Sequence, residues 1–176
     1  MAGVARAAAF LDRDGTLNVR PAAHRYVSSA ADFEWLPGAP EAVAALAAAG
    51  YFVAVVSNQR GVALGATPPA ALHAIEQRMQ RRLEPLGCRI DAFRYCVHDI
   101  DAGCSCRKPA PGLLIDTARE YGLDLPRSWM IGDSSSDVAA GRAAGCKTAL
   151  IAPGPSDARA DVTAGSLAEV GRILVG

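Results

Sequence analysis

Two aspartates follow a short apolar segment near the start of the chain, at Asp12 and Asp14 in the sequence DRDGT. Residues two apart in an extended chain point to the same side, so both carboxylates can face one pocket, and Gly15 lets the chain turn sharply behind them. One carboxylate can act as a nucleophile while the other transfers protons. An aspartate-rich turn with local hydrogen bonds is the alternative that this motif alone leaves open.

Further polar residues follow other apolar segments of the chain. Ser57 to Gln59 supply hydroxyl and amide groups that suit phosphoryl oxygens, or that serve as the cap of a helix. The Lys108 ammonium can neutralise a phosphate as a point charge, whereas a surface lysine is the ordinary alternative. Asp133, followed by Asp137, would bring another carboxylate beside the first pair, and carboxylate oxygens are the hard ligands that Mg²⁺ prefers. Each group is a weak signal alone, and their combination points to phosphate and magnesium.

Three cysteines and a histidine lie close together at Cys96, His98, Cys104 and Cys106, within a segment that we call the cysteine loop, residues 96–109. The members of each pair are two residues apart, so in extended geometry each pair projects to one side. The link between the pairs can then fold back and complete a tetrahedral Cys3His site, a usual composition for structural zinc. The spacing therefore predicts a zinc-bound loop.

Three other roles for these cysteines compete with zinc. A disulfide between Cys104 and Cys106 would close a small strained ring in a reducing compartment, and a nucleophilic thiol is redundant beside Asp12. Simple packing suits the isolated Cys88 and Cys146 better than it suits a polar loop with four soft ligands.

Apolar segments typical of buried strands alternate with helical segments along the chain. Strands are predicted at residues 7–11, 51–57, 90–96, 129–131 and 147–151. Helices are predicted at residues 40–50, 68–86, 112–121, 137–144 and 166–174. This alternation predicts an α/β fold, a single Rossmann-like domain over residues 1–176 with a mostly parallel sheet and helices on both faces. Ligands of such sheets bind at the carboxyl ends of the strands, where the polar residues lie.

The composition excludes several classes of partner. The chain has 176 residues, of which 51% are hydrophobic, enough for a substantial core without disulfides. Its 18 basic and 18 acidic residues cancel and form no basic block, so neither nucleic acid nor an acidic membrane surface is an implied partner. No segment predicts a secretory signal or a membrane span. We expect a cytoplasmic monomer that binds a small substrate, in a compartment that keeps thiols reduced.

Four motifs, in this order, resemble those of the haloacid dehalogenase-like (HAD) phosphohydrolases: FLDRDGTLN, VVSNQ, RKP and IGDSSSDVAAGRAAG. They span Phe10 to Gly145, which is most of the chain. The resemblance implies hydrolysis of a phosphate monoester through an aspartyl-phosphate, with Asp12 as the nucleophile. It implies that Asp14 protonates the leaving oxygen and then activates the hydrolytic water.

The same resemblance assigns the other polar residues. Ser57 and Lys108 would hold the transferring phosphoryl group, with Asp137 supporting the metal site. The ligands of Mg²⁺ would be Asp12, Asp14 through its backbone carbonyl, and Asp133. The spacing between motifs leaves no room for the cap domain that many of these phosphatases carry, so loops would select the substrate.

The cysteine loop followed by Arg-Lys-Pro resembles a capless, zinc-binding branch that contains D-glycero-D-manno-heptose-1,7-bisphosphate 7-phosphatases and related histidinol-phosphatase domains. The resemblance implies that Arg107 contacts the second phosphate or the sugar. The chain departs from the usual second motif of the heptose branch, Asn-Gln-Ser-Gly followed by Arg-Gly, because it has Arg60 in place of the serine and Leu64 in place of the later arginine. The other substrate contacts implied by the resemblance are Asn58, Gln59, Arg60 and, in a longer loop, Arg25 and Tyr26.

Removal of the 7-phosphate of a heptose bisphosphate is the function that these features favour. A histidinol phosphatase or another small sugar-phosphate phosphatase would use the same residues. A phosphotransferase or mutase would pass the phosphoryl group to a sugar instead of water. A non-catalytic zinc module that binds a partner would tolerate loss of the Asp12 nucleophile.

Overall fold

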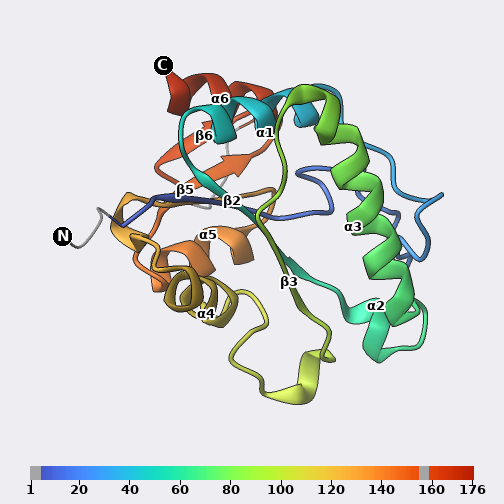
Figure 1. The fold of residues 1–176 in the computed structure, drawn as a ribbon. Helices are drawn as coiled ribbons and strands as arrows, with labels where there is room; N and C mark the ends of the chain where they lie inside the picture. The colour runs from blue at the N-terminus through green and yellow to red at the C-terminus, as the bar shows by residue number, and fades with distance from the viewer. Residues whose placement is uncertain (1–4, 155–158) are drawn as a thin grey trace.

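The computed structural model describes residues 5–154 and 159–176, which form a six-stranded parallel sheet with helices packed on both faces (Figure 1). The strands are β1 (Ala8–Leu11), β2 (Phe52–Asn58), β3 (Ala92–Cys96), β4 (Trp129–Gly132), β5 (Lys147–Ile151) and β6 (Val162–Ala164). The helices are α1 (Ala39–Ala48), α2 (Arg60–Ala63), α3 (Pro69–Leu83), α4 (Gly112–Tyr121), α5 (Ser135–Ala143) and α6 (Leu167–Val175). The predicted α/β fold is confirmed.

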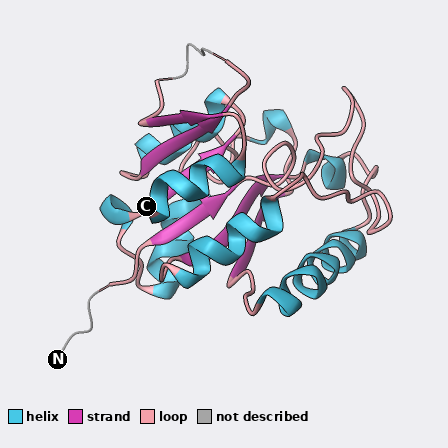
Figure 2. Ribbon diagram, turned by 90° about the horizontal axis from the view of Figure 1, so that it is seen from above, coloured by secondary structure: helices cyan, strands magenta, loops and turns pink. Residues whose placement is uncertain are grey.

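The strand order is β3-β2-β1-β4-β5-β6, and every neighbouring pair is parallel. The central strand β1 therefore lies between β2 and β4, and the loops that follow the strands gather at one end of the sheet (Figure 2). Because the carboxyl ends of parallel strands meet at one edge, Asp12, Ser57 and Asp133 come from adjacent strand ends. The topology alone thus assembles the predicted polar residues.

The side chains of the strands alternate between two hydrophobic clusters. In β1, Ala9 and Leu11 belong to the cluster that also contains core residues of α1, α3 and α6. Ala8 and Phe10 belong to the other cluster, which contains core residues of α4 and α5. All four of these β1 side chains are fully buried, as an uninterrupted apolar strand covered on both faces requires. The strand that leads to Asp12 is therefore fixed from both sides.

Most helix and strand boundaries lie within a few residues of those predicted from the sequence, and three elements differ from the prediction. The predicted helix 68–86 ends at Leu83 and continues as a 3-10 turn that contains Pro85, which has no backbone N–H to donate. The one-turn helix α2 and the edge strand β6 were not predicted. Both are too short to show a periodic pattern, and in β6 only Ala164 is buried.

No separate cap domain is present within residues 5–154 and 159–176. The chain between β1 and α1 is a loop, and between β2 and β3 it forms only α2, α3 and a 3-10 turn. The described part of the chain also contains no helix that is both long and apolar enough to span a membrane.

Candidate active site

Asp12, the first residue after β1, is buried beside the equally buried Lys108. The Lys108 Nζ lies 2.7 Å from Asp12 Oδ1 and 2.6 Å from Asp137 Oδ1, and it donates a hydrogen bond to the Val56 carbonyl at 2.9 Å. The Lys108 ammonium thus forms ion pairs with two carboxylates.

Burial and charge act in opposite directions on this cluster. Desolvation raises the pKa of Asp12 to about 6, although Lys108 draws it back down. Desolvation also disfavours the Lys108 ammonium, but the carboxylates of Asp12 and Asp137 outweigh it and raise the pKa of Lys108 above its ordinary value. Lys108 is therefore a permanent cation beside the predicted nucleophile.

Asp14 is held by three side chains. The guanidinium of Arg13 donates to Asp14 Oδ1 at 3.1 and 3.0 Å and to Oδ2 at 3.0 Å. Asn18 Nδ2 donates to Oδ1 and Gln59 Nε2 donates to Oδ2, each at 2.9 Å. Arg13 and Asn18 are fully buried, so these donors fix the orientation of the Asp14 carboxylate.

Carboxylate oxygens of Asp12, Asp133 and Asp137 converge within 4.8 Å of one another. Gly15 makes this approach possible, because its φ of 93° is unfavourable for other residues and an added Cβ would collide with the Asp133 carboxylate. Burial raises the pKa of Asp133, with Arg20 acting against the shift. An all-oxygen donor set of this kind fits a hard divalent cation such as Mg²⁺.

Arg20 contacts the same corner of the site. Its Nη2 lies 2.5 Å from Asp133 Oδ1 and 3.5 Å from the Asp14 carbonyl oxygen, which are two of the oxygens predicted to bind Mg²⁺. A side-chain cation at these oxygens shows that the corner attracts positive charge.

The residues at the end of β2 contact other parts of the protein. Ser57 Oγ accepts a hydrogen bond from Gln59 Nε2 at 3.0 Å. The Asn58 side chain exchanges two 3.0 Å hydrogen bonds with the backbone of Lys108. Arg60 Nε donates to Asp99 Oδ1 at 2.6 Å. The contacts that these side chains make in the structure are therefore with the protein, and their predicted contacts with substrate stay predictions.

The four predicted zinc ligands of the cysteine loop come together, with ligand atoms within 4.8 Å of one another. Cys96 Sγ lies 3.6 Å from both His98 Nδ1 and Cys104 Sγ, and His98 Nδ1 lies 3.2 Å from Cys106 Sγ. Ligands about 2.3 Å from a tetrahedral Zn²⁺ would be separated by roughly 3.8 Å, so the arrangement fits a zinc ion. All five cysteines are free thiols, so the disulfide alternative is not present.

The thiols of this cluster already differ in acidity. Burial raises the pKa of Cys104, but hydrogen bonds from Cys106 and from the backbone of Arg107 outweigh it and lower the pKa to about 7. A thiol that deprotonates near neutral pH is a ready metal ligand.

One cleft of about 560 Å³ unites the predicted catalytic and substrate residues. It is lined by Asp12, Asp14, Arg25, Tyr26, Ser57, Asn58, Gln59, Arg60, Arg107 and Lys108, all of which the sequence singled out. Arg20, Ile100 and Asp137 line it as well. The lining of this cleft thus combines the two aspartates with the guanidinium groups of several arginines.

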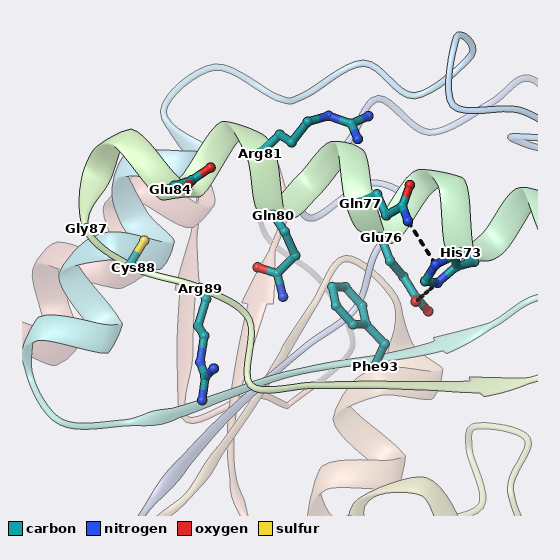
Figure 3. A pocket seen from close by; sticks show the side chains of 10 residues that line it. All are labelled: His73, Glu76, Gln77, Gln80, Arg81, Glu84, Gly87, Cys88, Arg89 and Phe93. Carbon is teal, nitrogen blue, oxygen red and sulfur yellow. Dashed lines mark hydrogen bonds and ion pairs between the residues drawn. The ribbon is translucent and has the colours of Figure 1, made fainter.

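A larger cleft of about 880 Å³ lies between α3 and the start of β3, and it shares no lining residue with the first (Figure 3). In Figure 3 Phe93 points from β3 toward α3, where His73 contacts Glu76 at 3.5 Å and Gln77 at 2.9 Å. The Gln80 side-chain amide donates a hydrogen bond to the Ile90 carbonyl and accepts one from the Ile90 N–H. These groups do not converge on a common point as the aspartates do, so we assign the chemistry to the smaller cleft.

Sequence reasoning missed four residues that shape the site: Arg13, Asn18, Arg20 and Asp99. Arg13 and Asn18 lie within or beside the DRDGT motif, so their positions could have suggested a role in holding Asp14. Nothing in the sequence signals that Arg20 reaches Asp133, or that Asp99 reaches Arg60, because both contacts join distant segments.

Comparisons with known proteins give a consistent picture. The HAD-hydrolase-like family model matches residues 105–169. A D-glycero-beta-D-manno-heptose-1,7-bisphosphate 7-phosphatase of Rhodopseudomonas palustris is 41% identical over 147 residues, which covers 80% of each chain. A D-glycero-alpha-D-manno-heptose-1,7-bisphosphate 7-phosphatase of Mycobacterium bovis is 38% identical over 166 residues, covering 91% of this chain and 87% of the relative.

A crystal structure gives the corresponding result for the fold. The D,D-heptose 1,7-bisphosphate phosphatase of Bordetella bronchiseptica, solved with magnesium and phosphate, superimposes with a TM-score of 0.85 at 36% identity. The match covers 96% of this chain and 98% of that chain.

Proposed function

Because this chain belongs to the heptose-1,7-bisphosphate 7-phosphatase family of HAD-like hydrolases, it is a phosphatase, and we propose that it removes the 7-phosphate of D-glycero-D-manno-heptose 1,7-bisphosphate. The observation that carries the proposal is that Asp12, Asp14 and Lys108 line the same cleft as several arginines. A substrate with two phosphates requires cations at two places, one beside the nucleophile and one at a distance from it.

In the proposed first step, a carboxylate oxygen of Asp12 attacks phosphorus. The bond between phosphorus and the sugar oxygen breaks, and Asp14 donates its proton to that oxygen. Lys108 and Ser57 bind the non-bridging oxygens, so the negative charge of the transition state meets positioned donors in a buried site.

In the second step, water attacks the aspartyl-phosphate and Asp14 accepts its proton, which releases inorganic phosphate and restores the Asp12 carboxylate. The hydrogen bonds from Arg13, Asn18 and Gln59 keep Asp14 oriented in both steps. Arg107, and with it Arg25 and Tyr26, would contact the rest of the substrate at the cleft lining.

We propose that Mg²⁺ is the cofactor, held by Asp12, Asp133 and the backbone carbonyl of Asp14, with Asp137 in support. Bound there, it would neutralise phosphoryl charge. The oxygen cluster supports this assignment, and so does the Arg20 cation at two of these oxygens.

We also propose that Cys96, His98, Cys104 and Cys106 hold a structural Zn²⁺, which suits action in the cytoplasm, where thiols stay reduced. We propose that the enzyme acts as a monomer. Zinc would stabilise a segment that places Arg107 and Lys108 at the substrate.

Metal analysis of the purified protein should find about one zinc per chain. Replacement of one ligand, Cys106→Ser, should release most of the zinc and raise KM for the sugar bisphosphate, because the cysteine loop loses its anchor. The matched variant Cys88→Ser changes a thiol outside the cluster and should keep the metal. Equal zinc contents in the two variants would contradict the assignment.

Phosphate release from a panel of compounds tests the substrate. We expect kcat/KM for heptose 1,7-bisphosphate to exceed that for histidinol phosphate by at least about 100-fold, since a single-phosphate substrate leaves the distant guanidinium groups without a partner. Both anomers belong in the panel, because the relatives include alpha and beta enzymes. Faster hydrolysis of histidinol phosphate would overturn the proposed substrate.

A labelled phosphoryl group separates hydrolysis from phosphotransfer. In the presence of acceptor sugars, label found on a sugar instead of in inorganic phosphate would reveal phosphotransfer.

A further inference from the structure

Three consecutive residues, from the last residue of β2 to the first residue of α2, contact the cysteine loop near its start, its middle and its end. The backbone N–H of Gln59 donates to the Cys96 carbonyl at 2.7 Å. Arg60 Nε donates to Asp99 Oδ1 at 2.6 Å. The Asn58 side chain makes both of its hydrogen bonds to the backbone of Lys108. Residues 58–60 thus attach the loop to the catalytic edge of the sheet at three points, in addition to the contacts of the Lys108 side chain with Asp12 and Asp137.

The middle attachment differs from the other two because it consists of charged side chains. Asp99 lies directly after the ligand His98, and its carboxylate also accepts the backbone N–H of Ile100 at 2.6 Å. Within the described residues, no other ion pair involves residues 97–106.

The segment held by Asp99 contributes to the cleft. Ile100 lines the cleft together with Arg107, whose Nη1 lies 3.5 Å from the His98 carbonyl oxygen. A shift of Asp99 would therefore move both the acceptor of Arg107 and its neighbour Ile100. Arg60 itself also lines the cleft, so its position alone fits either a substrate ligand or a contact that positions the loop.

We propose that Arg60 is a positioning residue that acts through Asp99 on the cysteine loop, and that it thereby sets how tightly the cleft binds the part of the substrate remote from Asp12. The inference rests on the proposed phosphatase function. Its basis is the short Arg60–Asp99 contact at the only charged attachment of residues 97–106 among the described residues. The guanidinium acts on the loop rather than on a phosphate.

A charge exchange separates the two roles of Arg60. Arg60→Asp and Asp99→Arg each place like charges together, and each should raise KM for heptose bisphosphate about tenfold with kcat changed less than about threefold. The double variant Arg60→Asp/Asp99→Arg restores an ion pair with reversed charges, and its KM should return to within about threefold of the parent. A substrate-ligand role predicts instead that the double variant stays as impaired as Arg60→Asp.

Hydrogen exchange of the amides of residues 97–106, measured without substrate, gives a readout that does not depend on the reaction. Each single variant should speed this exchange, and the double variant should restore the parent rates. The matched exchange Arg82→Glu/Glu41→Arg reverses a surface ion pair of 2.9 Å between α3 and α1 and should leave KM and the loop amides as in the parent.

If no variant hydrolyses the bisphosphate but the exchange rates follow the predicted pattern, the proposed substrate fails and the positioning role stands. If the double variant recovers neither KM nor the slow exchange, the positioning role is refuted.

Discussion

An Asp12→Asn variant is expected to lose phosphatase activity by a factor on the order of 10⁴ to 10⁶, and yet to be more stable than the parent protein at neutral pH in magnesium-free buffer. The loss of activity follows because an amide is isosteric with the carboxylate but cannot attack phosphorus. Every other group of the cleft stays in place.

The gain in stability follows from the buried charge of Asp12. Its pKa is about 6 in the folded protein and 3.8 when exposed, so the folded state binds this proton more tightly than the unfolded state does. The contribution of Asp12 to stability is therefore complete below about pH 4 and is lost as the pH rises to about 6. Asparagine does not ionise, so we expect the variant to gain about 1–3 kcal/mol in the free energy of unfolding at pH 7.5.

Denaturant unfolding at several pH values measures this effect. The difference in free energy between variant and parent should vanish near pH 4 and reach its full size above pH 6. Added Mg²⁺ should stabilise the parent more than the variant, since an amide is the weaker ligand. Asp116→Asn, the same change at an exposed position of α4, should alter neither activity nor the pH dependence. A variant that is less stable than the parent at pH 7.5 would contradict this account of the site.

Lys108→Met is the second change with a large expected effect, because it removes the ammonium that serves two buried carboxylates. Loss of one partner leaves an uncompensated buried charge, which typically costs about 3–5 kcal/mol of stability. The pKa of Asp12 should rise further, so less of the nucleophile is ionised. Together with the lost phosphoryl contact, we expect kcat to fall about 10³-fold.

A double variant separates stability from chemistry at this position. Lys108→Met/Asp137→Asn also removes one of the two uncompensated carboxylates, so it should recover part of the lost free energy of unfolding while its kcat stays low. Lys147→Met makes the same replacement at an exposed lysine that lies 5.4 Å from the Trp129 ring centroid, and it should cost less than about 1 kcal/mol. Recovery of activity in the double variant would show that Lys108 acts only through stability.

Part of the cleft could be read from the sequence because several predicted residues end or directly follow a buried strand, and a parallel sheet brings such positions to one edge. Asp12 after β1 and Ser57 near the end of β2 are examples. Arg25, Tyr26 and Arg107 do not end or directly follow a strand, and they were implied by the family resemblance. The spacing of the four predicted zinc ligands was informative for a similar reason, since residues two apart in an extended chain share a side.

Contacts between loops could not be predicted in this way. Arg20 meets Asp133, and Arg60 meets Asp99, across 113 and 39 positions of the sequence, and no periodic pattern links such partners. Arg13 is the opposite case, because its neighbour Asp14 is adjacent. Alternation predicts that neighbouring side chains diverge, whereas the turn at Gly15 brings the Arg13 guanidinium back to the Asp14 carboxylate.

The three attachments of the cysteine loop to residues 58–60 bear on how this enzyme can be re-engineered. Two of them use backbone groups of the loop and accept any loop sequence of the same path, whereas the Arg60–Asp99 pair requires both side chains. A transplanted loop without an acidic residue at position 99 would leave the Arg60 guanidinium without its carboxylate. Residue 60 and the loop should therefore be transferred together, as one exchangeable unit.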